Sequence, residues 1–461
     1  MNRTIIMLAA LFFFADAAFS MPIRGIVKAG KENLADVIVT DGFSFVRTDG
    51  NGRFEMDTHQ DADFVYLVTP DGYVASYSSG TPEFYLPLSP KQEDYQFNLI
   101  PNGKSDDCVM IAVADVQTRN NGQFERFREQ SIPDLKATIA AYSKTTRVMG
   151  ISLGDIVWDH FEHFPVYKKE IAGLGIPFYP VIGNHDHDKA QMSDKASEKS
   201  YKEQFGPTYY AFQFGNVYFI VLDNILYYGD KKYDEALTGE QVKWVKGLLK
   251  YIPEGSRITI ATHSPLHFQE KGMIPWANEL FAALKGYPTD LISGHTHLNS
   301  NHEIIPGVIE HNIGAICGTW WTADENRDGT PNGYAVFEIS DGRIQWYYKS
   351  TGHHRDWQFK LFPIGTVKDK ADCIVAKVWN WDPQWSVKWY EDGVLKGDME
   401  RFDGFDPDYL KYVEAKGSQS YTQPQKSFFY FSAKPSGNSR KIEVEVTDRF
   451  GRTYPRQSVT R

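Results

Sequence analysis

Five short polar segments in the middle of the sequence contain residue types that commonly bind metal ions. They supply aspartate, histidine, asparagine and glutamine side chains, and each follows an apolar run. In chain order they are Asp115-Val116-Gln117, Gly154-Asp155, Gly183-Asn184-His185-Asp186, Thr262-His263 and Gly294-His295-Thr296-His297. Carboxylate, imidazole and amide groups together suit borderline or hard divalent cations. The five segments therefore predict a metal centre.

This set of ligands is large enough for two adjacent ions. Asp155 is the natural bridge between them, because a carboxylate offers two oxygens. Two divalent ions about 3.5–4 Å apart can produce a bridging hydroxide and hold the oxygens of an in-line phosphoryl displacement. Glycines precede several of the ligands, and we expect them to let the backbone turn sharply and to leave room for a phosphate.

The apolar runs before these segments predict buried strands. They span residues 109–114, 148–153, 178–182, 258–261 and 291–292. A continuous apolar run is typical of a strand that is covered on both faces. Ligands of α/β sheets bind beyond the carboxyl ends of the strands, so we expect the five polar segments to meet at one edge.

Helical signals separate these strands. Ser131 is a candidate N-cap, with Pro133 in the first turn of the helix that follows. A second helix is expected over residues 161–174, and Thr238 with Gln241 forms a capping-box pattern before a third. The alternation of strands and helices predicts an α/β domain.

The ordered segments resemble the calcineurin-like metallophosphoesterases over roughly residues 105–345. The family pattern is Asp-x-His, Gly-Asp, Gly-Asn-His-Asp/Glu, His and Gly-His-x-His, in that order. The resemblance implies an αββα sandwich and a hydrolase that uses two divalent ions, drawn from Mn, Fe, Zn and Mg. Its reaction would be attack of a metal-bridging hydroxide on a phosphate ester.

The resemblance also implies roles for individual residues. One ion would be held by Asp115, Gln117, Asp155 and His297, and the other by Asp155, Asn184, His263 and His295. His185 would stand off the metals, stabilise the developing charge and protonate the leaving oxygen. Asp186 would orient His185. Gln117 departs from the pattern, since the family often has histidine there, and its neutral, harder oxygen would favour Mn²⁺ or Mg²⁺ over Zn²⁺.

β patterns flank the predicted catalytic domain, which we place at residues 105–349. Residues 22–100 contain short strand patterns, and Thr48 to Phe54 resembles the β-sandwich of carboxypeptidase regulatory-like domains. Residues 350–461 predict a mostly β C-terminal domain, with the alternative that these strands extend the catalytic sheet. The whole layout resembles bacterial exported phosphoesterases with a β domain on each side.

The net charge bears on the class of ligand, and the N-terminal sequence bears on the location of the protein. The formal net charge of −10 repels a phosphate backbone, which disfavours nucleic-acid binding and a nuclease of the same fold. Residues 1–20 have the pattern of a secretory signal peptide, with an uncleaved anchor as the alternative. We expect export to the periplasm or the outside, with no transmembrane segment after cleavage.

The sequence does not decide which class of phosphate ester is the substrate. A small-molecule or lipid-linked monoester, diester or diphosphate fits the same pair of metals, and the Asp-x-Gln start favours a diester or diphosphate. The rival hypothesis is an envelope binding or scaffold protein with an idle metal site. Trp158, Asp159, Asn299 and the segment 318–321 are candidate lining residues, although Asp159 is also a candidate helix cap. Residues 324–333 predict a surface turn or, alternatively, a substrate loop.

Overall fold

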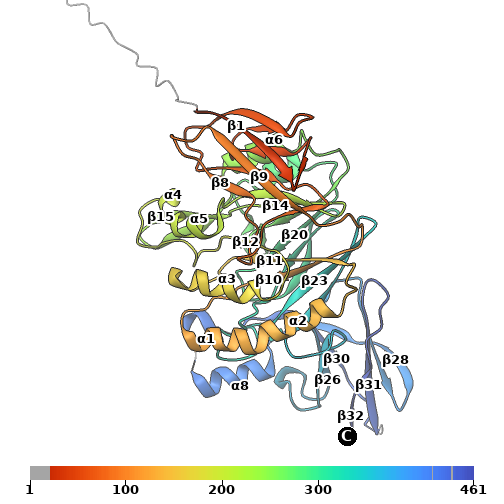
Figure 1. The fold of residues 1–461 in the computed structure, drawn as a ribbon. Helices are drawn as coiled ribbons and strands as arrows, with labels where there is room; N and C mark the ends of the chain where they lie inside the picture. The colour runs from red at the N-terminus through yellow and green to blue at the C-terminus, as the bar shows by residue number, and fades with distance from the viewer. Residues whose placement is uncertain (1–20, 418, 438–439, 461) are drawn as a thin grey trace, which may run out of the picture.

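The computed structural model describes residues 21–417, 419–437 and 440–460. The predicted signal peptide at residues 1–20 lies outside the described residues. Three regions follow one another along the long axis of the molecule, with the N-terminal strands at one end and the C-terminal strands at the other (Figure 1). The segments that contain the predicted ligands lie in the middle region.

Two sheets form the centre of the middle region. The first has the order β12-β11-β10-β23-β24, in which β10, β11 and β12 are parallel and β23 and β24 are antiparallel additions. Its strands are β10 (Cys108–Val113), β11 (Arg147–Leu153), β12 (Phe178–Val181), β23 (Gly333–Ser340) and β24 (Arg343–Ser350). The second has the order β13-β14-β17-β20-β22-β21, parallel from β14 to β22. Its strands are β13 (Tyr210–Phe214), β14 (Val217–Val221), β17 (Arg257–Ala261), β20 (Thr289–Ser293), β21 (Ser300–Ile305) and β22 (Val308–Asn312).

Helices complete an αββα sandwich. The first sheet packs on α1 (Asn121–Arg126), a π-helical turn (Phe127–Ser131), α2 (Ile132–Ala140), a 3-10 turn (Phe161–His163) and α3 (Phe164–Ala172). The second packs on α6 (Gly239–Leu248) and α7 (Ala277–Ala283). Alternate residues of β10 face opposite ways, since Val109 and Ile111 lie in the helix-side core and Met110 in the core between the sheets. The predicted fold class is confirmed.

One predicted helix start is wrong. Ser131 lies inside a continuous helical segment and makes no capping bond. The N-cap lies eleven residues earlier, where the side chain of Asn120 accepts the Gln123 N–H at 3.0 Å. Thr238 does cap α6, but Gln241 completes no box, because its side chain bonds both backbone groups of Asp223.

The N-terminal region is a β-sandwich. One sheet contains β1 (Met21–Ala29), β2 (Glu32–Asn33), β5 (Arg53–Thr58), β7 (Tyr73–Ala75) and β9 (Asp94–Pro101). The other contains β3 (Ile38–Thr40), β4 (Phe45–Arg47), β6 (Phe64–Val68) and β8 (Tyr85–Pro87). Its buried residues belong to the same apolar cluster as those between the central sheets, so the two regions share a continuous core.

The C-terminal region has its own pair of four-stranded sheets. The first contains β25 (Phe359–Phe362), β26 (Ile374–Val378), β29 (Glu400–Gly404) and β30 (Ser427–Ala433). The second contains β27 (Ser386–Glu391), β28 (Val394–Asp398), β31 (Lys441–Thr447) and β32 (Gln457–Thr460). Helix α8 (Pro407–Lys416) and 3-10 turns at Lys368–Lys370 and Ser420–Thr422 lie in the connections between strands of the first of these sheets. Within the described residues these strands do not pair with the central sheets, so the alternative that they extend the catalytic sheet is wrong.

Short elements fill the remaining connections. They are α4 (Asp194–Ser197), α5 (Lys199–Phe205) and two hairpins, β15 (Ile225–Gly229) with β16 (Lys232–Glu235) and β18 (His267–Phe268) with β19 (Gly272–Met273). The first hairpin ends at Glu235, which reaches the site described below. None of the helices in the described part of the chain combines the length and apolarity needed to cross a membrane.

Candidate metal centre

The predicted ligands converge because their strands end at the same edge. Asp115, Asp155, His263 and His295 each follow the last residue of β10, β11, β17 or β20 by two positions, and Asn184 follows β12 by three. The two sheets stack with these ends on one side. This is the arrangement expected from the sequence, and it brings residues from five loops into contact.

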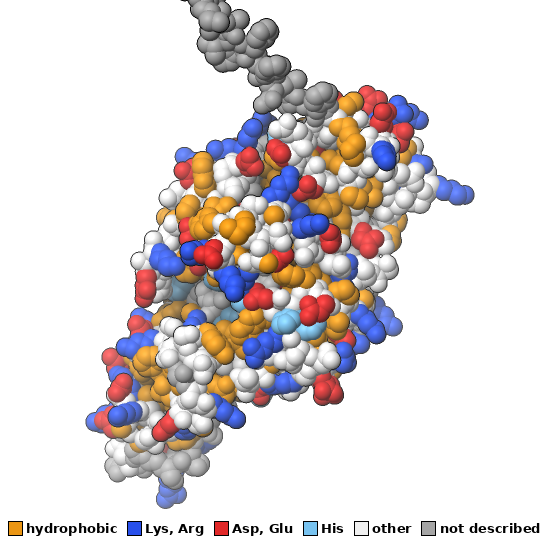
Figure 2. Space-filling view, turned by 90° about the vertical axis from the view of Figure 1, so that its left-hand side faces the viewer, with side chains coloured by type: hydrophobic (Ala, Val, Ile, Leu, Met, Phe, Trp, Pro, Cys, Tyr) orange, Lys and Arg blue, Asp and Glu red, His pale blue; other side chains and the backbone are white. Residues whose placement is uncertain are grey.

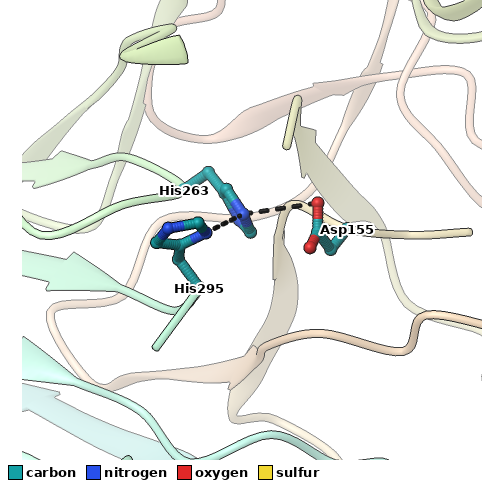
Figure 3. Close-up of side chains that lie close together, drawn as sticks. All are labelled: Asp155, His263 and His295. Carbon is teal, nitrogen blue, oxygen red and sulfur yellow. Dashed lines mark hydrogen bonds and ion pairs between the residues drawn. The ribbon is translucent and has the colours of Figure 1, made fainter. Parts of the chain in front are cut away.

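His263 lies at the centre of the cluster. Its Nε2 is 3.3 Å from Oδ1 of Asp155 and 3.1 Å from Nδ1 of His295, and these three side chains face one another (Figure 3). Asn184 joins through its Oδ1, 3.0 Å from the same Nε2. Ligand atoms of Asp155, His263 and His295 all lie within 4.8 Å of one another, a spacing that suits one shared cation.

The remaining three predicted ligands adjoin this group. Gln117 donates from Nε2 to Oδ2 of Asp155 at 3.0 Å. Asp115 accepts the backbone N–H of His295 at 3.0 Å, and its Oδ1 lies 3.5 Å from Nε2 of His297. All seven predicted ligands are therefore linked by an unbroken chain of close contacts.

Each of the three imidazoles has one nitrogen directed outward and one directed into the cluster. The outward partners are the Leu153 carbonyl for His263 at 2.7 Å and the Gly318 carbonyl for His297 at 3.5 Å. For His295 the outward partner is Glu235, whose Oε1 lies 3.5 Å from Nε2. Such outer contacts fix ring orientation at metal centres. Glu235 was not predicted, because nothing in its local sequence links it to the distant Gly-His-x-His segment.

The ligand side chains are buried, so without a cation their unpaired polar atoms would cost folding free energy. Burial, together with the nearby Asp155 carboxylate, raises the pKa of Asp115 well above its usual value. Burial also lowers the pKa of His263 to about 4 and that of His297 to about 3, which keeps both rings neutral at neutral pH. Oδ1 of Asp115 and Oε1 of Gln117 are buried without a hydrogen-bond partner. Neutral imidazoles and unpaired oxygens are what divalent ions bind, so the donor set fits a metal centre.

Backbone strain concentrates at the same residues. Five of the seven predicted ligands have positive φ: Asp115 (52°), Gln117 (46°), Asp155 (48°), His295 (69°) and His297 (53°). Non-glycine residues rarely adopt this conformation, and its clustering is typical of functional sites. The dihedral angles aim side chains of successive residues into one small volume.

The neighbouring glycines give the carboxylates space. A Cβ on Gly183 would lie 2.5 Å from Oδ1 of Asp155, and one on Gly294 would lie 2.7 Å from Oδ2 of Asp115. Of the glycines before the ligands, Gly154 has a positive φ of 79°. The main role of Gly183 and Gly294 is therefore to allow close approach between two ligand loops, not the sharp turn that the sequence predicted.

His185 stands beside the cluster. Its Nδ1 lies 2.9 Å from Oδ1 of Asp159 and 3.0 Å from Nζ of Lys189, while its backbone N–H donates to Asp155 at 2.8 Å. Burial alone would raise the pKa of Asp159, but hydrogen bonds from His185 and Lys189 lower it below its ordinary value. Lys189 was not among the predicted site residues.

The predicted role of Asp186 is wrong. Its carboxylate accepts backbone N–H groups of Gly183, Ile156 and Val157 at 2.9–3.2 Å, so it ties two ligand loops together. Asp159 contacts the His185 ring in its place. Peptide geometry explains the difference, since neighbouring side chains of a tight turn point in different directions.

The candidate lining residues have mixed outcomes. Trp158 lies beside His185 with ring centroids 5.4 Å apart, and Trp320 stacks on His297 at 4.4 Å. Asn299 instead faces the C-terminal region, where its Oδ1 accepts the Asn380 N–H at 2.7 Å. The segment 324–333 is not a surface turn, because Asn326, Asp328 and Thr330 are buried. It connects the His297 loop to the C-terminal sheets, with Asp328 accepting the Asn299 N–H at 2.8 Å.

Comparison with protein families agrees with this geometry. The family model for the calcineurin-like phosphoesterase matches residues 110–299. Models for the N-terminal and C-terminal parts of these proteins match residues 21–102 and 310–454. The chain belongs to the calcineurin-like phosphoesterase family. This phosphoesterase is thus a metal-dependent hydrolase of phosphate esters, and its family layout includes a flanking region on each side.

Similar solved structures are distant from this phosphoesterase. A dimetal phosphatase from Danio rerio is 15% identical, with 52% of this chain and 96% of that chain covered and a TM-score of 0.37. A purple acid phosphatase from yellow lupin seeds is 14% identical, covering 66% and 56% with a TM-score of 0.40. A 5'-nucleotidase from Candida albicans is 13% identical, covering 53% and 52% with a TM-score of 0.35. No curated protein matches the sequence.

Proposed function

We propose that this phosphoesterase hydrolyses its substrate at a dinuclear metal centre, without a covalent enzyme intermediate. Water would add to phosphorus, the P–O bond to the leaving group would break, and the released alcohol or phosphate would take up a proton. The observation that best supports this is the inward aim of His263, His295 and His297 toward two buried carboxylates. Side chains held in this way are preorganised for metal binding.

The ligand set divides between two positions. Asp115, Gln117, Asp155 and His297 would hold one ion, and Asp155, Asn184, His263 and His295 the other. When bound, the two ions would activate water and neutralise charge on the phosphoryl group. The amide oxygen of Gln117 makes the first position harder, which favours Mn²⁺ or Mg²⁺ there over Zn²⁺.

His185 would act on the substrate directly. Its ring is held at Nδ1 by Asp159, so its Nε2 is the nitrogen available to the phosphoryl or leaving oxygen. A protonated ring with an anionic partner can donate a hydrogen bond to developing negative charge and then transfer the proton. Lys189, 2.6 Å from Asp159, adds positive charge on the same side.

Location and domain limits belong to the same proposal. We propose that residues 1–20 direct export to the periplasm or the outside and are removed, and that domains span 22–100, 105–349 and 350–461. The signal-peptide pattern of the sequence supports export. N-terminal sequencing of the protein from fractionated cells tests it, and a cytoplasmic chain that begins at Met1 would contradict it.

Metal add-back tests the proposed reaction. The mature protein is stripped of metal and supplied with Mn²⁺, Mg²⁺, Zn²⁺ or Fe²⁺, then assayed on bis-p-nitrophenyl phosphate, p-nitrophenyl phosphate and a nucleoside diphosphate. We expect metal-dependent turnover that is lost in Asp155→Ala. Two bound ions without turnover of any ester would instead favour the envelope-binding alternative.

A further inference from the structure

Three aromatic rings form a corner beside the candidate metal centre. They are Trp158, Trp320 and Tyr421, which we call the aromatic corner. Ring centroids lie 6.1 Å apart for the two tryptophans, and Tyr421 lies 5.9 Å from Trp158 and 5.0 Å from Trp320. Tyr421 stands at 88° to Trp158 and 79° to Trp320, so the rings enclose an angle and do not form a stack.

The aromatic corner adjoins the residues proposed to act on phosphate. Trp158 lies against His185, and Trp320 covers one face of His297 with only 21° between the ring planes. A phosphoryl group held at the metal centre would therefore place its leaving group beside these rings.

Tyr421 is supplied by the C-terminal region and is held in place. The hydroxyl of buried Tyr409 donates to the Thr422 carbonyl at 3.1 Å, next to Tyr421. The Gln425 N–H donates to the Arg327 carbonyl at 2.9 Å, which fixes the other end of this segment to the middle region. Yet 44% of Tyr421 is exposed. A fixed and uncovered aromatic ring is well suited to bury its surface on a ligand.

One cation completes the aromatic corner. The guanidinium of Arg119, an exposed residue, lies 4.9 Å from the Trp158 ring centroid. On the face shown in Figure 2, acidic and basic side chains are interspersed, so the net charge of −10 is not gathered into one acidic patch there. Charge alone would therefore give little discrimination among phosphate esters, whereas three converging rings can discriminate by shape.

We propose that the aromatic corner binds a planar aromatic ring on the leaving group, so that preferred substrates are phosphate esters of the nucleoside type. This specificity rests on the proposed hydrolytic function. Aromatic side chains bind base rings through their faces and edges, and a guanidinium adds a further planar contact. A sugar ring would need polar partners for its hydroxyls, and the corner offers mainly apolar ring surface.

A substrate pair isolates the contribution of the ring. Adenosine 5′-monophosphate and ribose 5-phosphate share the scissile phosphomonoester and differ by the base. We expect Tyr421→Ala to lower kcat/KM for the nucleotide about tenfold through KM, and to leave ribose 5-phosphate unchanged. Leu410→Ala is the control, because Leu410 is a similarly exposed apolar residue on α8, outside the aromatic corner, and it should change neither substrate.

Calorimetric titration with adenosine separates this proposal from the hydrolytic one. Adenosine has no phosphate, so binding needs no turnover, and we expect saturable binding that weakens about tenfold in Tyr421→Ala. Adenosine binding that is lost in Tyr421→Ala would support binding of the base at the aromatic corner. If no ester is cleaved in the same preparation, the proposed hydrolysis would be overturned. Turnover with no preference for the nucleotide, equal losses for both substrates, or glucose binding as tightly as adenosine would overturn the aromatic corner.

Discussion

Nδ1 of His185 lies 2.9 Å from Oδ1 of Asp159, a residue that follows a different strand of the first central sheet. The adjacent carboxylate of Asp186 is directed to backbone N–H groups and is fully buried. Asp155, on the same loop after β11 as Asp159, accepts the His185 N–H. The pairing of His185 with Asp159 therefore depends on the packing of β11 beside β12, and the first prediction addresses it.

Asp159→Asn should lower kcat about 10- to 100-fold, because an amide cannot stabilise a protonated imidazole as a carboxylate does. Metal content should stay unchanged. Asp188→Asn is a control from the loop that contains His185, where the Asp188 carboxylate accepts hydrogen bonds from the Ala190 N–H and the Gln191 side chain. An unchanged kcat, or loss of bound metal in Asp159→Asn, would contradict this role.

Alanine at Asp155 and at His185 should have different effects on metal content. Asp155→Ala removes the shared ligand, so we expect loss of bound metal and of activity. His185→Ala should keep its metal and lose about 10²- to 10⁴-fold in kcat, the range for removal of a general acid. Elemental analysis beside steady-state kinetics measures both quantities. Metal loss in His185→Ala would make His185 a ligand.

Gly183→Ala adds a single methyl group and should still disrupt the metal centre. The added Cβ would lie 2.5 Å from Oδ1 of Asp155, which forces two ligand loops apart. We expect weaker metal binding and a loss of about 1–3 kcal/mol in the free energy of unfolding. Gly50→Ala is the matched control, because a Cβ at Gly50 would meet nothing within 4 Å. Equal metal affinity in both variants would rule out the packing argument.

A buried ion pair of the C-terminal region contacts the segment 324–333. Nζ of Lys377 lies 2.6 Å from Oδ2 of Asp406 and donates to the Gly329 carbonyl at 2.6 Å, with side chains 2% and 0% exposed. Asp406→Ala should cost about 3–5 kcal/mol of unfolding free energy, because it leaves a buried ammonium unpaired. Lys377→Met combined with Asp406→Leu should recover much of this loss. Denaturant titration measures both, and a mild effect of the single change would contradict the argument.

His311 should make the protein sensitive to acid. Burial, with a smaller contribution from Arg449, lowers the pKa of His311 to about 3, so the folded protein keeps the ring neutral. The unfolded chain takes up a proton below about pH 6.5, so stability is complete above that pH and falls by about 2 kcal/mol at pH 5. His311→Gln should abolish this part of the loss. Unfolding of both proteins at pH 8 and pH 5 tests it, and parallel losses would contradict it.

The local sequence was enough to predict the fold class and the members of the cluster. Apolar runs that end in Asp115, Asp155, Asn184, His263 and His295 specify strands and place polar residues at their ends. That rule holds because buried parallel strands must be apolar, and because their carboxyl ends share one edge. The capping residue of the first helix was predicted wrongly, since Pro133 can lie inside a helical segment when a π-helical turn precedes it.

Contacts between distant segments were decided by the tertiary structure. Glu235 reaches His295 through a hairpin, Asp159 replaces Asp186 beside His185, and Tyr421 comes to the site from the C-terminal region. No local pattern encodes these contacts, because each depends on how loops of separate elements are packed. The sequence by itself determined which residue types gather at the strand ends. The tertiary structure decided which of their neighbours orient them and which rings adjoin them, because side-chain direction in strained loops is set by packing.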